Sequence, residues 1–85
     1  MGLFGFFKKH DKQGPGPELL AQIQAWISDL GDQHWETRLR ACDSLGELGP
    51  VARRATPKLQ ELIVDEHGDV CLAAARALSN IERGL

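Results

Sequence analysis

The feature of this 85-residue chain that most constrains its fold is a segment that occurs twice. The segment DQHWETRLRACDSL covers Asp32–Leu45, and DEHGDVCLAAARAL covers Asp65–Leu78, thirty-three positions later. The residues that recur unchanged at this offset include Asp32 and Asp65, His34 and His67, Ala41 and Ala74, and Leu45 and Leu78. A repeat of this length is typical of a solenoid, in which each unit buries its apolar face only against its neighbours.

The composition predicts one small domain. A chain of this length buries roughly 60% of the surface that its unfolded state exposes. Its hydrophobic and charged fractions, 42% and 26%, are ordinary for a soluble protein. The net charge of −2 gives no indication of nucleic-acid binding. The charge is uneven, because residues 1–13 carry three lysines and one aspartate, whereas residues 14–85 carry seven bases and eleven acids.

Two cysteines, Cys42 and Cys71, lie in apolar helical segments. We expect no secretory signal sequence before them, since the lysines of MGLFGFFKKH follow a short apolar run instead of preceding a long one. We therefore expect two unpaired, buried thiols and a cytoplasmic protein. No stretch approaches the ~20 apolar residues that a transmembrane helix needs.

The segment KQGPGPE at 12–18 divides the chain in two. Two Gly-Pro pairs cannot continue a helix and offer few side chains for packing. We expect residues 1–16 to form an apolar and basic tail with a linker, and residues 17–85 to form a helical repeat domain.

Apolar residues three to four positions apart predict a helix over each of 17–30, 35–48, 50–64 and 68–82. The first starts at Pro17, a favoured first-turn residue, and Gly31 ends it. Pro57 lies inside the third pattern, so it must kink that helix or mark its true start. The apolar faces consist of Leu39, Cys42, Leu45 and Leu48, then Leu59, Leu62 and Ile63, then Val70, Ala74, Ala77, Leu78 and Ile81.

The repeat sets the order of these helices. Helix 17–30 ends just before Asp32, as helix 50–64 ends at Asp65, so helix 17–30 corresponds to the second helix of a preceding unit. No strand-like alternation occurs. We predict an all-α fold, a short α-solenoid of about four antiparallel helices, roughly two repeats in the order B-A-B-A.

The stretch TRLRACDSLGELGPVARRATPKLQELIVDEHGDVCLAAARALSNI resembles the short bacterial HEAT repeat, of the HEAT-like type found in phycobilisome lyases. The resemblance covers about 32–82, with 17–31 as a degenerate half-repeat. Its most specific parts are LGELG at 45–49 and TPKLQELIVD at 56–65. It implies a non-enzymatic scaffold or adaptor that binds another protein. The alternative that it implies is an accessory factor to a bilin or other cofactor enzyme.

Some positions depart from the family pattern. The family places Asn or Asp, then Pro, at the helix start, and an inward Arg that pairs with the turn Asp of neighbouring units. The resemblance implies pairing of Arg38 with Asp32 and Asp65, without a second such arginine, so helix 68–82 resembles a terminal, atypical repeat. The departures at the start of each unit are His34 and His67, Trp35 and Gly68, and Cys71 in place of arginine.

His67 and Cys71 are four residues apart and share a helix face, and His34 is equivalent to His67 one unit earlier. They could supply part of a zinc site. Stacked helices, however, lie about 8–10 Å apart, whereas zinc bonds measure about 2.0–2.3 Å. Activation of Cys71 by His67 would also need an oxyanion hole that nothing here supplies. We expect turn residues and a buried thiol, with no metal, no cofactor and no catalytic residue.

A basic cluster of Arg53, Arg54 and Lys58 begins helix 50–64, and helix 17–30 offers Gln22 and Asp29 beside it. In HEAT arrays this second helix lines the concave side. The cluster is either a solvated charged face or a groove for an acidic or amphipathic partner segment. The chain is too short and too acidic for a nucleic-acid channel.

The tail contains Leu3, Phe4, Phe6 and Phe7, followed by lysines, and holds all three phenylalanines of the chain. A core would normally include such residues. Three interpretations remain open: docking on this domain or on a sister chain, which includes a homo-oligomer; binding to a partner or weakly to a membrane surface, as in a peripheral adaptor; and disorder.

Overall fold

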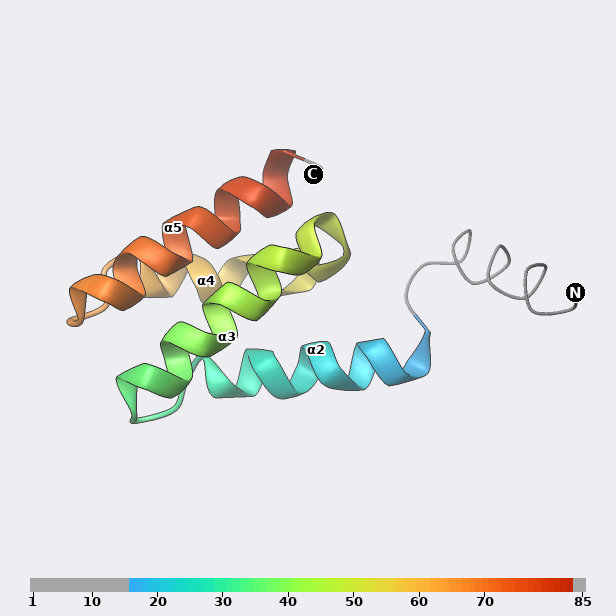
Figure 1. Ribbon diagram of the computed structural model, residues 1–85, viewed down its shortest axis with the longest axis horizontal. Helices are drawn as coiled ribbons and strands as arrows, with labels where there is room; N and C mark the ends of the chain where they lie inside the picture. Colours follow the sequence, from blue (N-terminus) through green and yellow to red (C-terminus); the bar gives the residue numbers. More distant parts are fainter. Residues whose placement is uncertain (1–15, 84–85) are drawn as a thin grey trace, which may run out of the picture.

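The computed structural model describes residues 16–83, which are helical throughout except for short turns and contain no strand. Along the chain the elements are α2 (Pro17–Asp29), α3 (Trp35–Leu48), the 3-10 segment η1 (Gly49–Ala55), α4 (Thr56–Leu62) and α5 (Gly68–Arg83) (Figure 1). The predicted all-α class is confirmed. The predicted tail residues Leu3, Phe4, Phe6 and Phe7 lie outside the described residues.

The first described helix begins where its sequence predicts. Pro17 occupies the first turn of α2, where its missing N–H costs nothing, and Glu18 places an acid at the positive end of the helix dipole. Ile23 and Leu30 are buried, and Trp26 is partly buried against the core. The helix is held by this one apolar face.

The segment predicted as helix 50–64 is not one continuous helix, and its α-helical part begins next to Pro57, which is one of the two outcomes that the sequence allowed. The segment starts as η1, in which Ala52 departs from helical geometry (φ −94°, ψ 22°), and α4 begins only at Thr56. Pro57 lies in the first turn of α4, because proline lacks the N–H that would continue a preceding helix. The helix ends at Leu62, so Ile63, predicted to lie on its apolar face, is 44% exposed instead.

Helices α3 and α5 lie side by side, and the contact between them is the most extensive between any two elements. In Figure 1 they run next to each other with α4 behind them and α2 on the far side of α3. Gly46 allows this approach, since a Cβ atom built there would lie 3.0 Å from the Cα of Ala77. Small residues at such a crossing bring two backbones close together.

The buried core joins residues from every element. Leu45 and Leu78, which recur in the sequence, are both buried, whereas Leu39 and Leu48 of the predicted stripe are only half-buried. None of the helices within residues 16–83 combines the length and the apolar content needed to cross a bilayer. The core members are Ile23, Leu30, Ala41, Cys42, Leu45, Ala52, Ala55, Leu59, Leu62, Val70, Ala73, Ala74, Ala77, Leu78 and Ile81.

Candidate functional site

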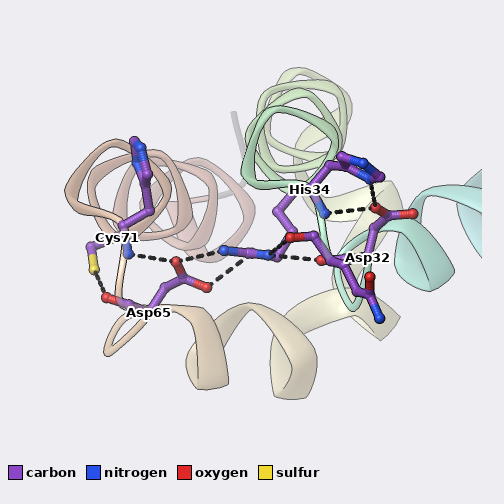
Figure 2. Close-up of polar contacts among 7 residues, drawn as sticks. Asp32, His34, Asp65 and Cys71 are labelled. Atoms are coloured by element: carbon purple, nitrogen blue, oxygen red, sulfur yellow. Dashed lines mark hydrogen bonds and ion pairs between the residues drawn. The ribbon is translucent and has the colours of Figure 1, made fainter.

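The loops that precede α3 and α5 have the same hydrogen-bonded geometry. In the first loop, the backbone N–H of His34 donates to the Asp32 carboxylate at 2.8 Å. In the second loop, the N–H of His67 donates to the Asp65 carboxylate at 2.8 Å (Figure 2). Each carboxylate thus satisfies one of the N–H groups near a helix start that lacks an intrahelical partner. The repeat in the sequence is therefore a repeat in three dimensions.

Arg38 of α3 joins these two loops. Its Nη1 donates to the backbone carbonyl of Asp32 at 2.7 Å and to that of Gln33 at 3.1 Å. Its Nη2 donates to the Asp65 carboxylate at 3.1 Å, and its Nε lies 3.0 Å from the other carboxylate oxygen. The two side chains are only 11% and 9% exposed. A planar guanidinium that meets a carboxylate at two points fixes orientation as well as distance.

The pairing implied by the family resemblance is present, with one difference in its chemistry. Arg38 contacts the side chain of Asp65, as expected, but it reaches Asp32 through the backbone carbonyl. The carboxylate of Asp32 instead contacts His34, through the backbone N–H at 2.8 Å and the ring Nδ1 at 3.0 Å.

Both loop carboxyl groups are stabilised as anions. Burial by itself would raise the pKa of Asp65, but hydrogen bonds from the His67 N–H and from Arg38 outweigh it and hold the pKa below the ordinary value of 3.8. The pKa of Asp32 is also lowered, mainly by the hydrogen bond from the His34 N–H. Each carboxylate is therefore charged near neutral pH and acts only as an acceptor.

Cys71 occupies the position in α5 that Arg38 occupies in α3. Its Sγ donates to the backbone carbonyl of Asp65 at 2.8 Å, the counterpart of the bond from Arg38 to the carbonyl of Asp32. Cys71 is half-buried and not buried as predicted, because it lies at the loop and its thiol bonds to the loop backbone. Cys42 is fully buried, and this burial raises its pKa to about 11, so it remains a protonated, packed side chain.

The indole of Trp35 stacks on the imidazole of His67, with ring centroids 3.8 Å apart and an angle of 11° between the planes. This contact links the start of α3 to the loop before α5. Sequence analysis did not identify it. The recurrence of histidine before each helix was the one available signal, and it does not say what covers the ring.

The candidate metal ligands do not assemble. Within residues 16–83, no three His, Cys, Asp or Glu side chains gather closely enough to hold a metal ion. His67 packs against Trp35, Cys71 donates to the loop carbonyl, and His34 contacts Asp32.

A hollow of about 470 Å³ opens beside the arginine-linked loops. Lys58 is the one predicted partner-binding residue among those lining it, and its Nζ lies 3.4 Å from Glu61 on the exposed surface. The acids outnumber the bases around it by four to two. The lining residues are Leu30, Gly31, Asp32, Arg38, Lys58, Glu61, Leu62, Asp65 and Glu66.

The other predicted partner-binding residues lie elsewhere on the surface. Arg53 and Arg54 are exposed on η1, at the end of that segment. Gln22 is exposed and Asp29 half-buried on α2. Of the predicted set, Lys58 alone borders the hollow.

Comparison with known families agrees with this geometry. The family model described as HEAT repeats matches residues 23–84, which is most of the chain and includes both repeated loops. No curated protein and no solved structure matches the chain. The matched residues and the repeated, arginine-linked loops place this chain in the HEAT repeat family.

Proposed function

We propose that this chain is a non-enzymatic module for protein–protein interaction. The observation that carries the proposal is the HEAT repeat match over residues 23–84, because HEAT repeats generally act as protein-interaction scaffolds. The chemistry of the loops agrees with it. Arg38 bonds to the Asp65 carboxylate and to the backbone carbonyl of Asp32, and Cys71 bonds to the backbone carbonyl of Asp65. These side chains therefore hold neighbouring units in register.

We further propose that the elements follow the order B-A-B-A, with α2 as the second helix of one unit, α3 and η1–α4 as a complete unit, and α5 as the first helix of the next. The supporting observation is the correspondence of the loops before α3 and α5. The phycobilisome-lyase type of the repeat, and with it an accessory role toward a bilin or other cofactor enzyme, rests on the sequence resemblance. A visible absorbance band in protein purified from its native host tests that role.

The surface that we propose for a partner consists of Arg53, Arg54 and Lys58, with Gln22 and Asp29 on α2. All three bases are exposed, Arg53 and Arg54 on η1 and Lys58 on α4. An acidic or amphipathic segment of another protein would match their charge. Rim charges of this kind govern the association rate and its salt dependence more than they add affinity.

The test is cross-linking followed by affinity capture, with the wild type compared with an Arg53→Glu/Arg54→Glu variant. We expect the variant to lose partners that the wild type retains. The matched control is Arg76→Glu/Arg83→Glu, because both of these arginines are exposed on α5 and the charge change is equal. Equal capture by all three proteins would exclude the basic surface as the binding site. Failure of the wild type to capture any partner would contradict the interaction module itself.

A peripheral membrane adaptor is a second proposal, supported by the gathering of Leu3, Phe4, Phe6 and Phe7 before Lys8 and Lys9 in the sequence. Four apolar side chains and a few lysines give weak, reversible attachment. Full-length protein would co-sediment with anionic liposomes, and a full-length variant with serine at the three phenylalanines would not. Equal sedimentation of the two proteins would exclude this role.

The oligomeric state and the compartment are also proposals. Val64 and Leu72 are large apolar residues that the described structure leaves exposed, and we propose that they contribute to contacts between copies of the chain in a homo-oligomer. Exchange of the tail between chains would have the same outcome. Cys42 and Cys71 are both unpaired, as in proteins of the reducing cytoplasm. Sedimentation velocity tests the homo-oligomer: the wild type should sediment as an oligomer and a Leu72→Ser variant as a smaller species.

A further inference from the structure

The two repeated loops differ in what covers them. At the second loop, Arg38 binds the Asp65 carboxylate and the indole of Trp35 stacks on His67. At the first loop, the Asp32 carboxylate contacts only His34 among the described residues, and the ring of His34 has no stacking partner there. The Asp32 side chain is 39% exposed and the His34 side chain 78% exposed.

The first loop nevertheless shares the backbone hydrogen bond of the second, and in addition its histidine ring lies 3.0 Å from the carboxylate. Its carboxylate is fixed by a 2.8 Å hydrogen bond from the backbone N–H two residues later, as in the second loop. It is also charged, since the same hydrogen bond lowers the pKa of Asp32. The first loop therefore offers a fixed, ionised carboxylate and an exposed histidine ring, the two groups that Arg38 and Trp35 of α3 contact at the second loop.

We propose that the Asp32–His34 loop is a docking site for a helical turn of a partner protein that carries an aromatic residue and, three residues later, an arginine. This spacing is that of Trp35 and Arg38 on α3, which occupy the equivalent loop. The arginine binds the Asp32 carboxylate and the aromatic ring stacks on His34. The inference rests on the proposed interaction function and assigns it a surface and a partner chemistry.

The occupant is a different protein and not a second copy of this chain. Arg38 is buried and engaged with Asp65 and two backbone carbonyls, so a second copy cannot offer it without breaking its own contacts. The equivalent residue of α5 is Cys71, which has no charge to present to Asp32 when protonated.

The bound segment is short. Ala77 of α5 packs against Gly46 of α3, and the residue of α3 that corresponds to Ala77 is Ser44, with Arg40 one turn before it. The remainder of this face of α3 is therefore polar and cannot bury the apolar stripe of a long helix. Only the first turn of a partner helix meets a matched surface.

The probe is a peptide with the sequence of residues 33–40, in which an Arg40→Lys substitution is linked to Glu36 by a side-chain lactam. Both positions are exposed on α3, so the link holds the helix without touching Trp35 or Arg38. The peptide is titrated into isotope-labelled full-length protein, and the amide signal of His34, whose N–H is bonded to Asp32, reports binding.

We expect saturable shifts at His34, and an Asp32→Asn protein to bind the peptide about tenfold or more weakly, because a charge-assisted contact is lost. An Arg38→Ala peptide should lose a similar factor, and the two changes together should cost little more than either alone. The Trp35→Ala peptide and the His34→Ala protein should each weaken binding, and combining them should cost little more than either change alone. Asp43→Asn is the control, since Asp43 is an exposed acid elsewhere on α3 and its replacement should have no effect.

Four results would overturn the proposal: no saturable shift, equal binding by the Asp32→Asn protein, shifts centred on His67, or binding only after Phe6→Ser and Lys9→Ser substitutions. The third would mean that the peptide replaces the chain's own α3, and the fourth that the chain's own first residues occupy the loop. If the protein does not bind the peptide but still captures partners through Arg53 and Arg54, this docking site is excluded and the proposed interaction function stands.

Discussion

Arg38 and Asp65, twenty-seven residues apart, form a two-point ion pair that joins the start of α3 to the loop before α5. The same guanidinium holds the backbone of the preceding loop through the carbonyls of Asp32 and Gln33. One side chain thus fixes both repeated loops relative to each other. The stack of Trp35 on His67 reinforces the same junction.

We predict that Arg38→Ala lowers the free energy of unfolding by about 3–5 kcal/mol, because it leaves the Asp65 carboxylate, whose side chain is only 9% exposed, without its partner. Arg38→Lys should recover only part of this loss, since a lysine ammonium cannot span the carboxylate and two carbonyls. Urea denaturation followed by circular dichroism measures both values.

The matched control is Arg40→Ala, which removes an exposed arginine from the same helix and should change the stability by less than about 0.5 kcal/mol. If Arg38→Ala and Arg40→Ala cost the same, the ion pair does not hold the loops together.

The pH dependence of stability should show the contribution of Asp65. Its pKa is lowered in the folded protein, so its stabilising contribution is fully present above the ordinary value of 3.8 and is lost as the pH falls through the folded value. We predict that Asp65→Asn is less stable than the wild type at pH 7, and that the difference shrinks at about pH 2.5. Denaturation at a series of pH values measures it.

Asp32→Asn gives the comparison, because that carboxyl group lacks the arginine contact and is more exposed. Its effect on the acid limb should be the smaller of the two. A difference between the wild type and Asp65→Asn that stays constant down to the lowest pH would contradict the assigned pairing.

The packing of α3 against α5 can be tested at Leu45. This side chain is fully buried, so Leu45→Ala should open a cavity and cost about 2–5 kcal/mol. Thermal and denaturant unfolding measure the loss. A cost below about 1 kcal/mol would mean that the cavity collapses or that this face does not carry the core.

Gly46 tests the distance between the same two helices. Gly46→Ala places a methyl group 3.0 Å from the Cα of Ala77, and a backbone atom cannot swing aside as a side chain does. We predict a loss of about 1–3 kcal/mol despite the higher helix propensity of alanine. Adding Ala77→Gly should restore only part of the loss, because the close contact is with Cα.

Ser44→Ala is the control for helix propensity, since it lies on α3 away from this crossing and should be neutral or mildly stabilising. If Gly46→Ala stabilises the protein as much as Ser44→Ala does, the space between α3 and α5 accommodates a methyl group and the close contact is absent.

The two cysteines should differ in reactivity. The thiol of Cys42 is buried and its pKa is raised to about 11, so iodoacetamide at pH 8 should leave it intact in the folded protein. Cys71 is half-buried and should be the first to be modified. Mass spectrometry of the digested protein identifies the labelled site, and both thiols should react once urea unfolds the chain. Faster labelling of Cys42 than of Cys71 would contradict its burial.

The sequence by itself determined the positions of α2, α3 and α5 and the side on which α3 and α5 bury Leu45 and Leu78. Apolar spacing located α3 to the residue, Pro17 and Pro57 marked two helix starts, and the offset between Leu45 and Leu78 identified the buried side. These features follow from local chain geometry, because a period of 3.6 residues and the missing N–H of proline act within one or two turns. The pairing of Arg38 with Asp65 was accessible through the family resemblance.

Only the tertiary structure decided how the units meet. It showed that Arg38 takes the backbone carbonyl of Asp32, that Trp35 covers His67, and that Gly46 contacts Ala77. Each of these contacts joins residues that no helical period relates. Their distances depend on the separation and rotation of packed helices, which many side chains set together. For the same reason the sequence could show that the loops at Asp32 and Asp65 are alike, whereas only the packed structure shows that α3 covers one of them and leaves the other exposed.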